Sequence, residues 1–402
     1  MKQRRLSLLA ILIAISLTAC SQATFIRPAD STPAAAEQQV AARSLILFIG
    51  DGMGPEMLSL AKIYSDKVLG TSLNLATLSA TGTMGMVTTY SANRLVTDSA
   101  AGATAIATGV KTNNGMVGQS PEGEVLVSLL ELASGAGKSV GVVTTTSVTD
   151  ATPASFLTHI AARGKEIDIA VQMVGSDAVV VMGGGRAFFT ADGGKRTDGR
   201  DLIAEAREKG FDVAFDREGL AAAGGRRLLG LFADEDIPFE GERVAYETPS
   251  LAEMFLKALR MLADDPDGFV LVVEGGRIDH AEHENNLAEA MGELLAFDEA
   301  IGEAMQYQRS DSALIIVVTA DHDTGAPALT ATDRGYPPVE SAGSLLDKDY
   351  GFLAWLSRNH AGTMVPVIAR GPGDDIFAGL RDNTDTNRSM ISILGLETAG
   401  AR

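Results

Sequence analysis

The residues best suited to chemistry in this sequence are carboxylates and histidines that follow runs of apolar residues. The richest turn spans 274–283 (EGGRIDHAEH), in which Glu274, Asp279 and His283 fall within ten residues. Carboxylate and imidazole groups at this spacing are suitable ligands for Zn²⁺, and Glu274 is also suited to a hard Mg²⁺ ion. A solvated turn of charged residues is the alternative for this segment taken alone.

Other parts of the sequence repeat this pattern. Asp51 follows one apolar run, Asp321 and His322 follow another, and His360 precedes a third. The chain has five histidines, and three of them lie in acid-containing turns at predicted strand ends. Scattered structural histidines would not gather in this way, so the combined pattern indicates metal binding. The ligands predicted from this pattern are Asp51, Asp279, His283, Asp321, His322 and His360.

A stretch of small residues at 96–105 (VTDSAAGATA) predicts a helix that begins near Asp98 or Ser99, because alanine is the strongest helix former. Unpaired N–H groups and the helix dipole favour negative charge at such an end, so an alkoxide or a bound phosphate at Ser99 would be stabilised. The small side chains would also let other loops approach closely. The simpler alternative is that Asp98 or Ser99 only caps the helix.

A second helix start is predicted at 149–154 (TDATPA), with Asp150 or Thr152 as its cap. His159 and Arg163 follow four residues apart, which would place them on one face of that helix. The guanidinium of Arg163 is suited to two hydrogen bonds with a phosphoryl group. As a lone residue, however, it would more often be the partner of a surface carboxylate.

The apolar runs that position these residues are typical of buried parallel strands. Open sheets of this kind collect ligands beyond the carboxyl ends of their strands. We therefore expect an α/β fold, with a mostly parallel central sheet sandwiched by helices. The expected strands cover residues 44–49, 138–146, 178–182, 268–273 and 313–318, with a proline-containing and therefore peripheral strand at 364–369.

A long helix is expected over 284–305, with an apolar stripe that Asp298 interrupts. Asp298 could be a buried partner of the site or of a helix end, and an exposed position is an equal alternative. Residues 190–250 are more charged and glycine-rich, so we expect them to be peripheral and assign them no chemistry. The short interval between Gly325 and His360 leaves room only for small insertions.

The charge of this chain of 402 residues restricts its partners. A net charge of −19 argues against nucleic acid as a natural partner. An anionic substrate would also be repelled unless bound cations reversed the local field, which agrees with the predicted metal ligands.

The N-terminus has the features of a bacterial lipoprotein signal, with a plain secretory signal as the alternative. Lys2, Arg4 and Arg5 precede an apolar stretch, too short for a membrane span, that ends before Cys20. Cys20 is the only cysteine, which suits a lipid anchor and excludes an intrachain disulfide. We therefore expect a protein anchored in the cell envelope, on the periplasmic side of an outer membrane if the host has one. The expected segments are a signal peptide at 1–19, a flexible tether at 20–43 and a catalytic domain at 44–402.

Several of these motifs occur in one order along the chain. They are 50–54 (GDGMG), 97–101 (TDSAA), 150–154 (DATPA) with Arg163, 274–279 (EGGRID) with His283, 319–322 (TADH) and 360–362 (HAG). As a set they resemble the motifs of the alkaline phosphatases, and the resemblance covers about residues 45–369.

The resemblance implies a role for each matching residue. Ser99 would be the nucleophile, and Arg163 would bind the non-bridging phosphate oxygens. One zinc ion would be held by Asp279, His283 and His360, and a second, next to Ser99, by Asp51, Asp321 and His322. A magnesium ion would be shared by Asp51, Glu274 and Thr152, with Asp150 acting through water. His280 occupies a position where the family also has lysine, and it would tune the third metal site or bond to phosphate-bound water.

The activity that the resemblance implies is hydrolysis of small phosphate monoesters through a phosphoserine at Ser99, with inorganic phosphate as product. Its cofactors would be two zinc ions and one magnesium ion. A phosphodiesterase, sulfatase or phosphonate hydrolase with the same two-metal core is the nearest alternative. A lipid-anchored metal- or phosphate-binding protein without turnover is a second alternative, which a missing ligand or nucleophile would favour. Many relatives are dimers, so the resemblance also allows a homodimer.

Overall fold

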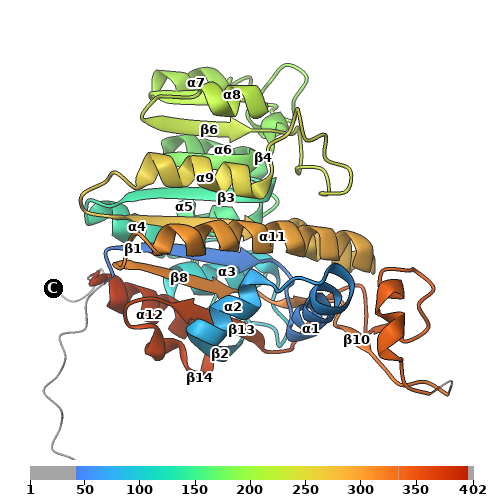
Figure 1. Ribbon diagram of the computed structural model, residues 1–402. Coiled ribbons are helices and arrows are strands. Elements are labelled where there is room, and N and C mark those ends of the chain that lie inside the picture. The colour runs from blue at the N-terminus through green and yellow to red at the C-terminus, as the bar shows by residue number, and fades with distance from the viewer. Residues whose placement is uncertain (1–41, 334, 397–402) are drawn as a thin grey trace, which may run out of the picture. The chain divides into compact units, whose positions relative to one another are not determined.

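A ten-stranded sheet with helices on both faces is the central feature of the fold (Figure 1). The structure, a computed structural model, describes residues 42–333 and 335–396. The predicted signal peptide, Cys20 and the tether as far as residue 41 lie outside the described residues. Within the described ranges, no helix is both long enough and apolar enough to cross a bilayer.

The strands of the sheet lie in the order β14-β2-β13-β8-β1-β7-β3-β4-β6-β5. All neighbouring pairs in this sheet are parallel except those of β13, which runs antiparallel to β8 and β2. The expected α/β class with a mostly parallel sheet is therefore confirmed. The strands are β1 (Ser44–Gly50), β2 (Thr83–Thr88), β3 (Ser139–Ser147), β4 (Val180–Gly184), β5 (Phe211–Ala214), β6 (Arg227–Leu231), β7 (Phe269–Gly275), β8 (Leu314–Thr319), β13 (Val365–Arg370) and β14 (Gly379–Asp382).

The middle of the sheet is apolar on both faces. Every residue of β1, β7 and β8 is buried, as expected for parallel strands covered by helices on both sides. β1 lies between the other two, with Ile49 paired to Glu274 on β7 and to Thr319 on β8. The turns that follow these three strands are consequently neighbours at the carboxyl ends of the central strands.

Two layers of helices enclose the sheet. α9 and α11 lie across the near face in Figure 1, where α9 packs on β3 and β7 and α11 packs on β1, β7 and β8. α3, α4 and α5 lie behind the sheet in the same view. The α-helices are α1 (Pro55–Tyr64), α2 (Asn74–Thr81), α3 (Ser99–Thr108), α4 (Leu129–Gly135), α5 (Ala151–Leu157), α6 (Glu166–Gly175), α7 (Leu202–Glu208), α8 (Arg217–Ala222), α9 (Leu251–Leu262), α10 (Arg277–His283), α11 (Leu287–Gln308) and α12 (Asn383–Leu394).

The shorter elements complete the chain. A π-helical turn, η1 (Ser65–Leu69), continues α1, and the 3₁₀ turns are η2 (Arg186–Phe188), η3 (Val339–Ser344) and η4 (Asp374–Phe377). Between Gly325 and His360 the chain forms η3 and a small sheet of β10 and β11, as the short interval suggested. The small strands are β9 (Asp323–Thr324), β10 (Pro327–Leu329), β11 (Leu353–Trp355) and β12 (His360–Ala361).

The long helix expected over 284–305 is α11, and Asp298 on it is buried. The Asp298 carboxylate accepts hydrogen bonds from the backbone N–H groups of Asn74 (2.8 Å) and Leu75 (2.7 Å). These are among the unpaired donors at the start of α2, so Asp298 is a partner of a helix end. The alternative of an exposed position is wrong.

The strand at 364–369 was expected to be peripheral because of Pro366, and this is wrong. β13 lies inside the sheet between β8 and β2. Its pairing with β8 begins only at Val367, opposite Thr319, so the missing N–H of Pro366 interrupts no pairing with that strand.

Candidate active site

The candidate site lies beyond the carboxyl ends of β1, β7, β3 and β8, where ligands collect in open α/β sheets. Asp51 follows β1 directly, and Asp321 follows β8. The turn after β1 passes very close to its neighbours: a Cβ atom on Gly54 would lie 2.1 Å from Oδ1 of Asp323. Glycine is therefore required there for close packing of the two turns.

Ser99 is the first residue of α3, as the small-residue stretch predicted. Asp98 caps the helix by accepting the Ala101 N–H at 3.1 Å, so capping and a buried serine occur together. Ser99 Oγ lies 3.2 Å from Nε2 of His322. The helix comes this close because Gly102 has no side chain: a Cβ there would lie 2.8 Å from the Asp321 carbonyl oxygen.

Three of the predicted ligands form one group near the mouth of the site. Nε2 of His283 lies 3.2 Å from Nε2 of His360 and 3.3 Å from Oδ2 of Asp279. The other ring nitrogens face backbone carbonyl oxygens: Nδ1 of His283 lies 2.6 Å from that of Arg358, and Nδ1 of His360 lies 2.9 Å from that of Thr97. These carbonyl groups fix the orientation of both rings.

A second group lies deeper. Nε2 of His322 is 3.2 Å from Oδ2 of Asp321 and 3.6 Å from Oδ1 of Asp51, and all three residues are buried. Those two carboxylate oxygens have no hydrogen-bond partner. Asp279 lies between the two groups. A carboxylate oxygen of Asp279 also lies within 4.8 Å of possible ligand atoms of Asp51 and His322.

The third set of predicted ligands surrounds the end of β7. Oε1 of Glu274 and the hydroxyl of Thr152 are buried without a hydrogen-bond partner. Oε2 of Glu274 accepts a hydrogen bond from Thr144. Asp150 differs from these residues, because its Oδ1 accepts a direct hydrogen bond from Arg163 at 2.7 Å.

Burial of so many carboxylates changes how readily they ionise. Burial, together with neighbouring carboxylates, raises the pKa of Asp51 well above its usual range and that of Glu274 to about 8. It also raises the pKa of Asp321 to about 7. Burial opposes ionisation of Asp279 too, but the hydrogen bond with His283 and the nearby imidazoles lower its pKa. A site with these charges is one that bound cations would stabilise.

Arg163 lies on the rim, held by two carboxylates. Its guanidinium contacts Oδ1 of Asp150 at 2.7 Å and Oδ2 of Asp98 at 3.7 Å. The expectation that His159 and Arg163 share a helical face is wrong. α5 ends at Leu157, and the chain then extends because Ile160 pairs with Val117 in an isolated β-bridge.

The segment assigned no chemistry contributes one residue to the site. Residues 190–250 include β5 and β6 at the sheet edge, as expected, but Asp236 returns to the centre. Asp236 accepts hydrogen bonds from the Ser147 N–H (2.8 Å) and from Arg277 (3.1 Å), and it lies 3.4 Å from Nδ1 of His280. Asp236 lies in an acidic stretch that looks like an ordinary solvated loop, so the sequence alone does not identify it as a residue of the site.

Two more buried groups were missed although they lie in or beside predicted motifs. Thr324 contacts both Asp279 and His322. Glu282 is fully buried, and neither of its carboxylate oxygens has a partner. Neither residue stands out in the sequence, because each lies beside carboxylates and histidines that are stronger candidate ligands.

Comparison with known proteins agrees with this geometry. The family model for alkaline phosphatase matches residues 42–342. The repressible alkaline phosphatase of Saccharomyces cerevisiae is 40% identical over 70% of this chain, which spans only 55% of the yeast protein. Streptomycin-6-phosphate phosphatase of Streptomyces griseus is 37% identical, over 92% of this chain and 94% of that protein.

The fold has close relatives among solved structures. The crystal structure of Thermus thermophilus alkaline phosphatase matches with a TM-score of 0.81 and 30% identity, over 92% of this chain and 96% of the other. The family match covers the strands from β1 to β10, the serine helix and every predicted metal ligand except His360. The chain belongs to the alkaline phosphatase family, and it is a phosphatase that acts on phosphate monoesters.

Proposed function

We propose that this chain hydrolyses small-molecule phosphate monoesters through a phosphoserine at Ser99, with two zinc ions and one magnesium ion as cofactors. The observation that carries the proposal is the position of Ser99. It is buried at the N-terminus of α3, with its Oγ 3.2 Å from Nε2 of His322. A helix N-terminus favours a developing oxyanion there, and a metal ligand is its immediate neighbour.

The first proposed zinc site is Asp279, His283 and His360. Backbone carbonyl groups only accept hydrogen bonds, so the Nδ1 atoms of both histidines carry protons. The lone pairs of the two Nε2 atoms then converge at 3.2 Å beside the Asp279 carboxylate. Two imidazoles held by second-sphere carbonyls and one carboxylate form a donor set that suits zinc with an open position.

The second zinc site and the magnesium site would share Asp51. Unpartnered buried oxygens of Asp51 and Asp321 beside His322 support zinc. Unpartnered buried oxygens of Glu274 and Thr152 support a hard cation such as Mg²⁺. Asp150 would act on this ion through water, since its direct partner is Arg163.

When bound, the metal ions would lower the pKa values of the Ser99 hydroxyl and of a hydrolytic water, and neutralise phosphoryl charge. Ser99 Oγ gives its proton to solvent water and attacks phosphorus; its bond to phosphorus forms as the ester bond breaks. The leaving alkoxide takes a proton from water. A water molecule then attacks the phosphoserine, which releases inorganic phosphate and restores the serine hydroxyl.

Arg163 would bind the non-bridging oxygens of the transferred group, since the planar guanidinium can donate two parallel hydrogen bonds. Asp150 and Asp98 hold it on one side. A dianionic terminal phosphoryl group offers more charge to this arginine than a diester does, so monoesters are the proposed substrates. We expect diester cleavage only as a weaker side activity of this monoesterase. The alternative main function is that of a phosphodiesterase, sulfatase or phosphonate hydrolase of the same superfamily.

We also propose a lipid anchor on Cys20 in the cell envelope and a homodimer as the assembled form, with no nucleic acid partner. Cys20 and the apolar stretch before it support the anchor, and the net charge of −19 argues against a nucleic acid partner. Replacement of Cys20 by serine should release the protein from the membrane fraction, and sedimentation of the released protein would give its oligomeric state.

The decisive test of the mechanism uses Ser99→Ala with Ser134→Ala, on α4, as a matched control. The first variant should lose about 10³-fold or more in kcat for p-nitrophenyl phosphate while elemental analysis still finds about two zinc and one magnesium per chain. The control should behave as wild type. Unchanged turnover in Ser99→Ala would overturn the assignment of Ser99 as nucleophile. Wild-type activity that survives treatment with chelators would overturn the assignment of the metal cofactors.

A further inference from the structure

His159 lies outside the proposed metal sites, two residues after the end of α5, and both of its ring nitrogens are engaged. Nδ1 lies 2.8 Å from the carbonyl oxygen of Gly118, and Nε2 lies 2.8 Å from Oε1 of Glu131 on α4. Both partners are hydrogen-bond acceptors, so both nitrogens donate and the ring is an imidazolium. The hydrogen bond to Glu131 accordingly raises the pKa of His159.

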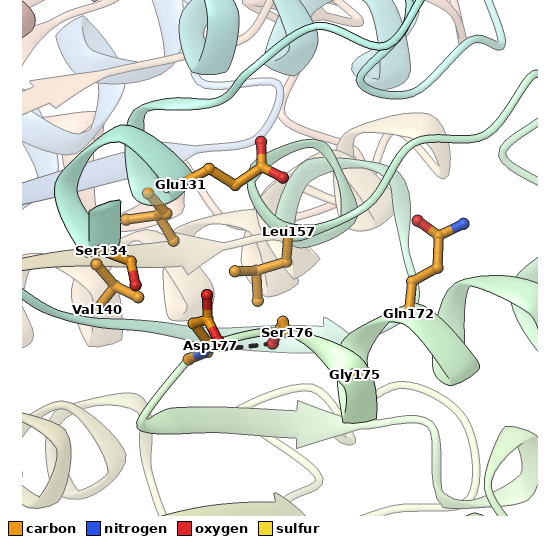
Figure 2. Close-up of a pocket in the computed structure, with 10 residues that line it drawn as sticks. Glu131, Ser134, Val140, Leu157, Gln172, Gly175, Ser176 and Asp177 are labelled. Atoms are coloured by element: carbon orange, nitrogen blue, oxygen red, sulfur yellow. Dashed lines mark hydrogen bonds between the residues drawn. The ribbon is translucent and has the colours of Figure 1, made fainter. Parts of the chain in front are cut away.

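The backbone of His159 is held as firmly as its ring. Its N–H donates to Oε1 of Gln172 at 2.8 Å, and Nε2 of Gln172 donates back to the His159 carbonyl at 3.1 Å. Figure 2 shows Glu131 and Gln172 at the wall of a cavity of about 340 Å³, with Leu157 between them. The hydrogen bonds of His159 and Gln172 fix the segment beside this cavity.

The segment that His159 fixes leads directly to Arg163. Val117 and Ile160 exchange two backbone hydrogen bonds, of 2.9 and 2.8 Å. The Arg163 N–H then donates to the Gly115 carbonyl at 2.8 Å. One short two-stranded arrangement thus joins residues 115–118 to residues 158–163, and His159 closes it at the Gly118 end.

The same arrangement reaches the start of the serine helix. The Gly115 N–H donates to Oδ2 of Asp98 at 2.9 Å, while Oδ1 of Asp98 caps α3 through Ala101. The backbone of Arg163 and the N-terminus of Ser99's helix are therefore tied to the same loop. A shift of this loop would move the guanidinium relative to the serine oxygen.

We propose that His159 is a positioning residue for Arg163: it clamps residues 115–118 against residues 158–163 and so sets where the guanidinium meets the phosphoryl group. His159 itself touches neither substrate nor metal in this arrangement. The inference rests on the phosphate-binding role proposed for Arg163 above.

The test compares His159→Gln with Ser250→Ala, a matched control. Ser250 caps α9, on the other face of the sheet, by accepting the Glu253 N–H at 3.2 Å. His159→Gln should raise KM for p-nitrophenyl phosphate and Ki for inorganic phosphate by about 10-fold, because misplacement of a binding group weakens both. The zinc content should stay at the wild-type level.

Ser250→Ala should lower the melting temperature with KM and Ki unchanged. Equal increases of KM in both variants would mean that general loosening, and not positioning, is responsible, which would overturn the inference. Glu131→Gln keeps the size of the His159 partner and removes its charge, so it should also raise Ki for phosphate. If His159→Gln fails to fold, Glu131→Gln serves as the test of the inference.

A double-mutant cycle shows whether His159 acts through Arg163. Arg163→Ala alone should raise Ki for phosphate, and adding His159→Gln should raise it no further. If Arg163→Ala leaves Ki unchanged, the proposed role of Arg163 is wrong. If Arg163→Ala raises Ki but His159→Gln and Glu131→Gln do not, the inference about His159 alone is overturned.

Discussion

The hydroxyl of Thr324 donates a hydrogen bond to Oδ1 of Asp279 at 2.5 Å, and its oxygen lies 3.2 Å from Nδ1 of His322. Since the only hydrogen of this hydroxyl goes to Asp279, its oxygen accepts the Nδ1–H of His322. The Nε2 lone pair of His322 then faces the Ser99 hydroxyl and the buried carboxylates. One buried threonine therefore orients a ligand from each proposed zinc site.

Replacing Thr324 by valine keeps its shape and removes this hydroxyl. We expect zinc affinity to fall by about 10- to 100-fold, as is usual when a second-sphere partner is lost. Competition with a chromogenic chelator measures the affinity, and Thr324→Ser, which keeps the hydroxyl, should bind zinc as the wild type does. A Thr324→Val variant with wild-type affinity would show that the two ligands are oriented by other contacts.

Gly102 sets the distance between the serine helix and the turn after β8. A Cβ atom there would lie 2.8 Å from the Asp321 carbonyl oxygen, so Gly102→Ala must push α3 and the turn apart. We expect kcat to fall by roughly 10- to 100-fold, because small misplacements of a nucleophile are costly. Gly135→Ala is the control, since nothing lies within 4 Å of a Cβ at that position; its kcat should be unchanged.

Asp298 joins α11 to the start of α2 through two backbone donors. Asp298→Ala leaves both N–H groups without that partner, so the free energy of unfolding should fall by about 1–3 kcal/mol. Asp298→Asn retains one acceptor oxygen and should lose less. Urea unfolding measures both. The hydrogen bonds of Asp298 go to Asn74 and Leu75 and to none of the proposed ligands, so specific activity per folded molecule should stay constant. A fall in kcat of the Asn variant would contradict a purely structural role.

Much of this fold could be predicted because the signals were local. Strands such as β1 and β8 are unbroken apolar runs, and the turns after them carry the ligands. The start of α3 was equally clear from its alanines and from Asp98. Each of these signals depends only on residues adjacent in sequence.

What sequence reasoning missed depends on contacts between distant segments. His159 leaves the helical pattern because the next residue, Ile160, forms a β-bridge with Val117, which lies 43 residues before Ile160. β13 lies inside the sheet because β2 covers its free edge, a pairing that no local pattern indicates. Asp236 reaches His280 only after β6 has placed its loop beside the end of β3.

Glu282 gives a prediction about pH. It is fully buried against the turn after β1, and a Cβ atom on Gly52 would lie 2.7 Å from its Oε2. Burial, strengthened by Asp279 and Asp323, raises the pKa of Glu282 well above its usual range. An acid whose pKa is raised by folding holds its proton in the native state and not in the unfolded state, so stability falls as the pH rises above its ordinary value of 4.5.

Glu282→Gln removes that titration and should therefore melt at a higher temperature than the wild type, by a margin that is larger at pH 9 than at pH 7. Differential scanning calorimetry of the chelator-treated proteins measures the margin, since a bound cation would offset the charge of Asp279. The exposed neighbour Glu284 provides the control, because Glu284→Gln should show no such pH-dependent gain. A lower melting temperature for Glu282→Gln at both pH values would show that the carboxylate is ionised in the native state and would contradict the raised pKa.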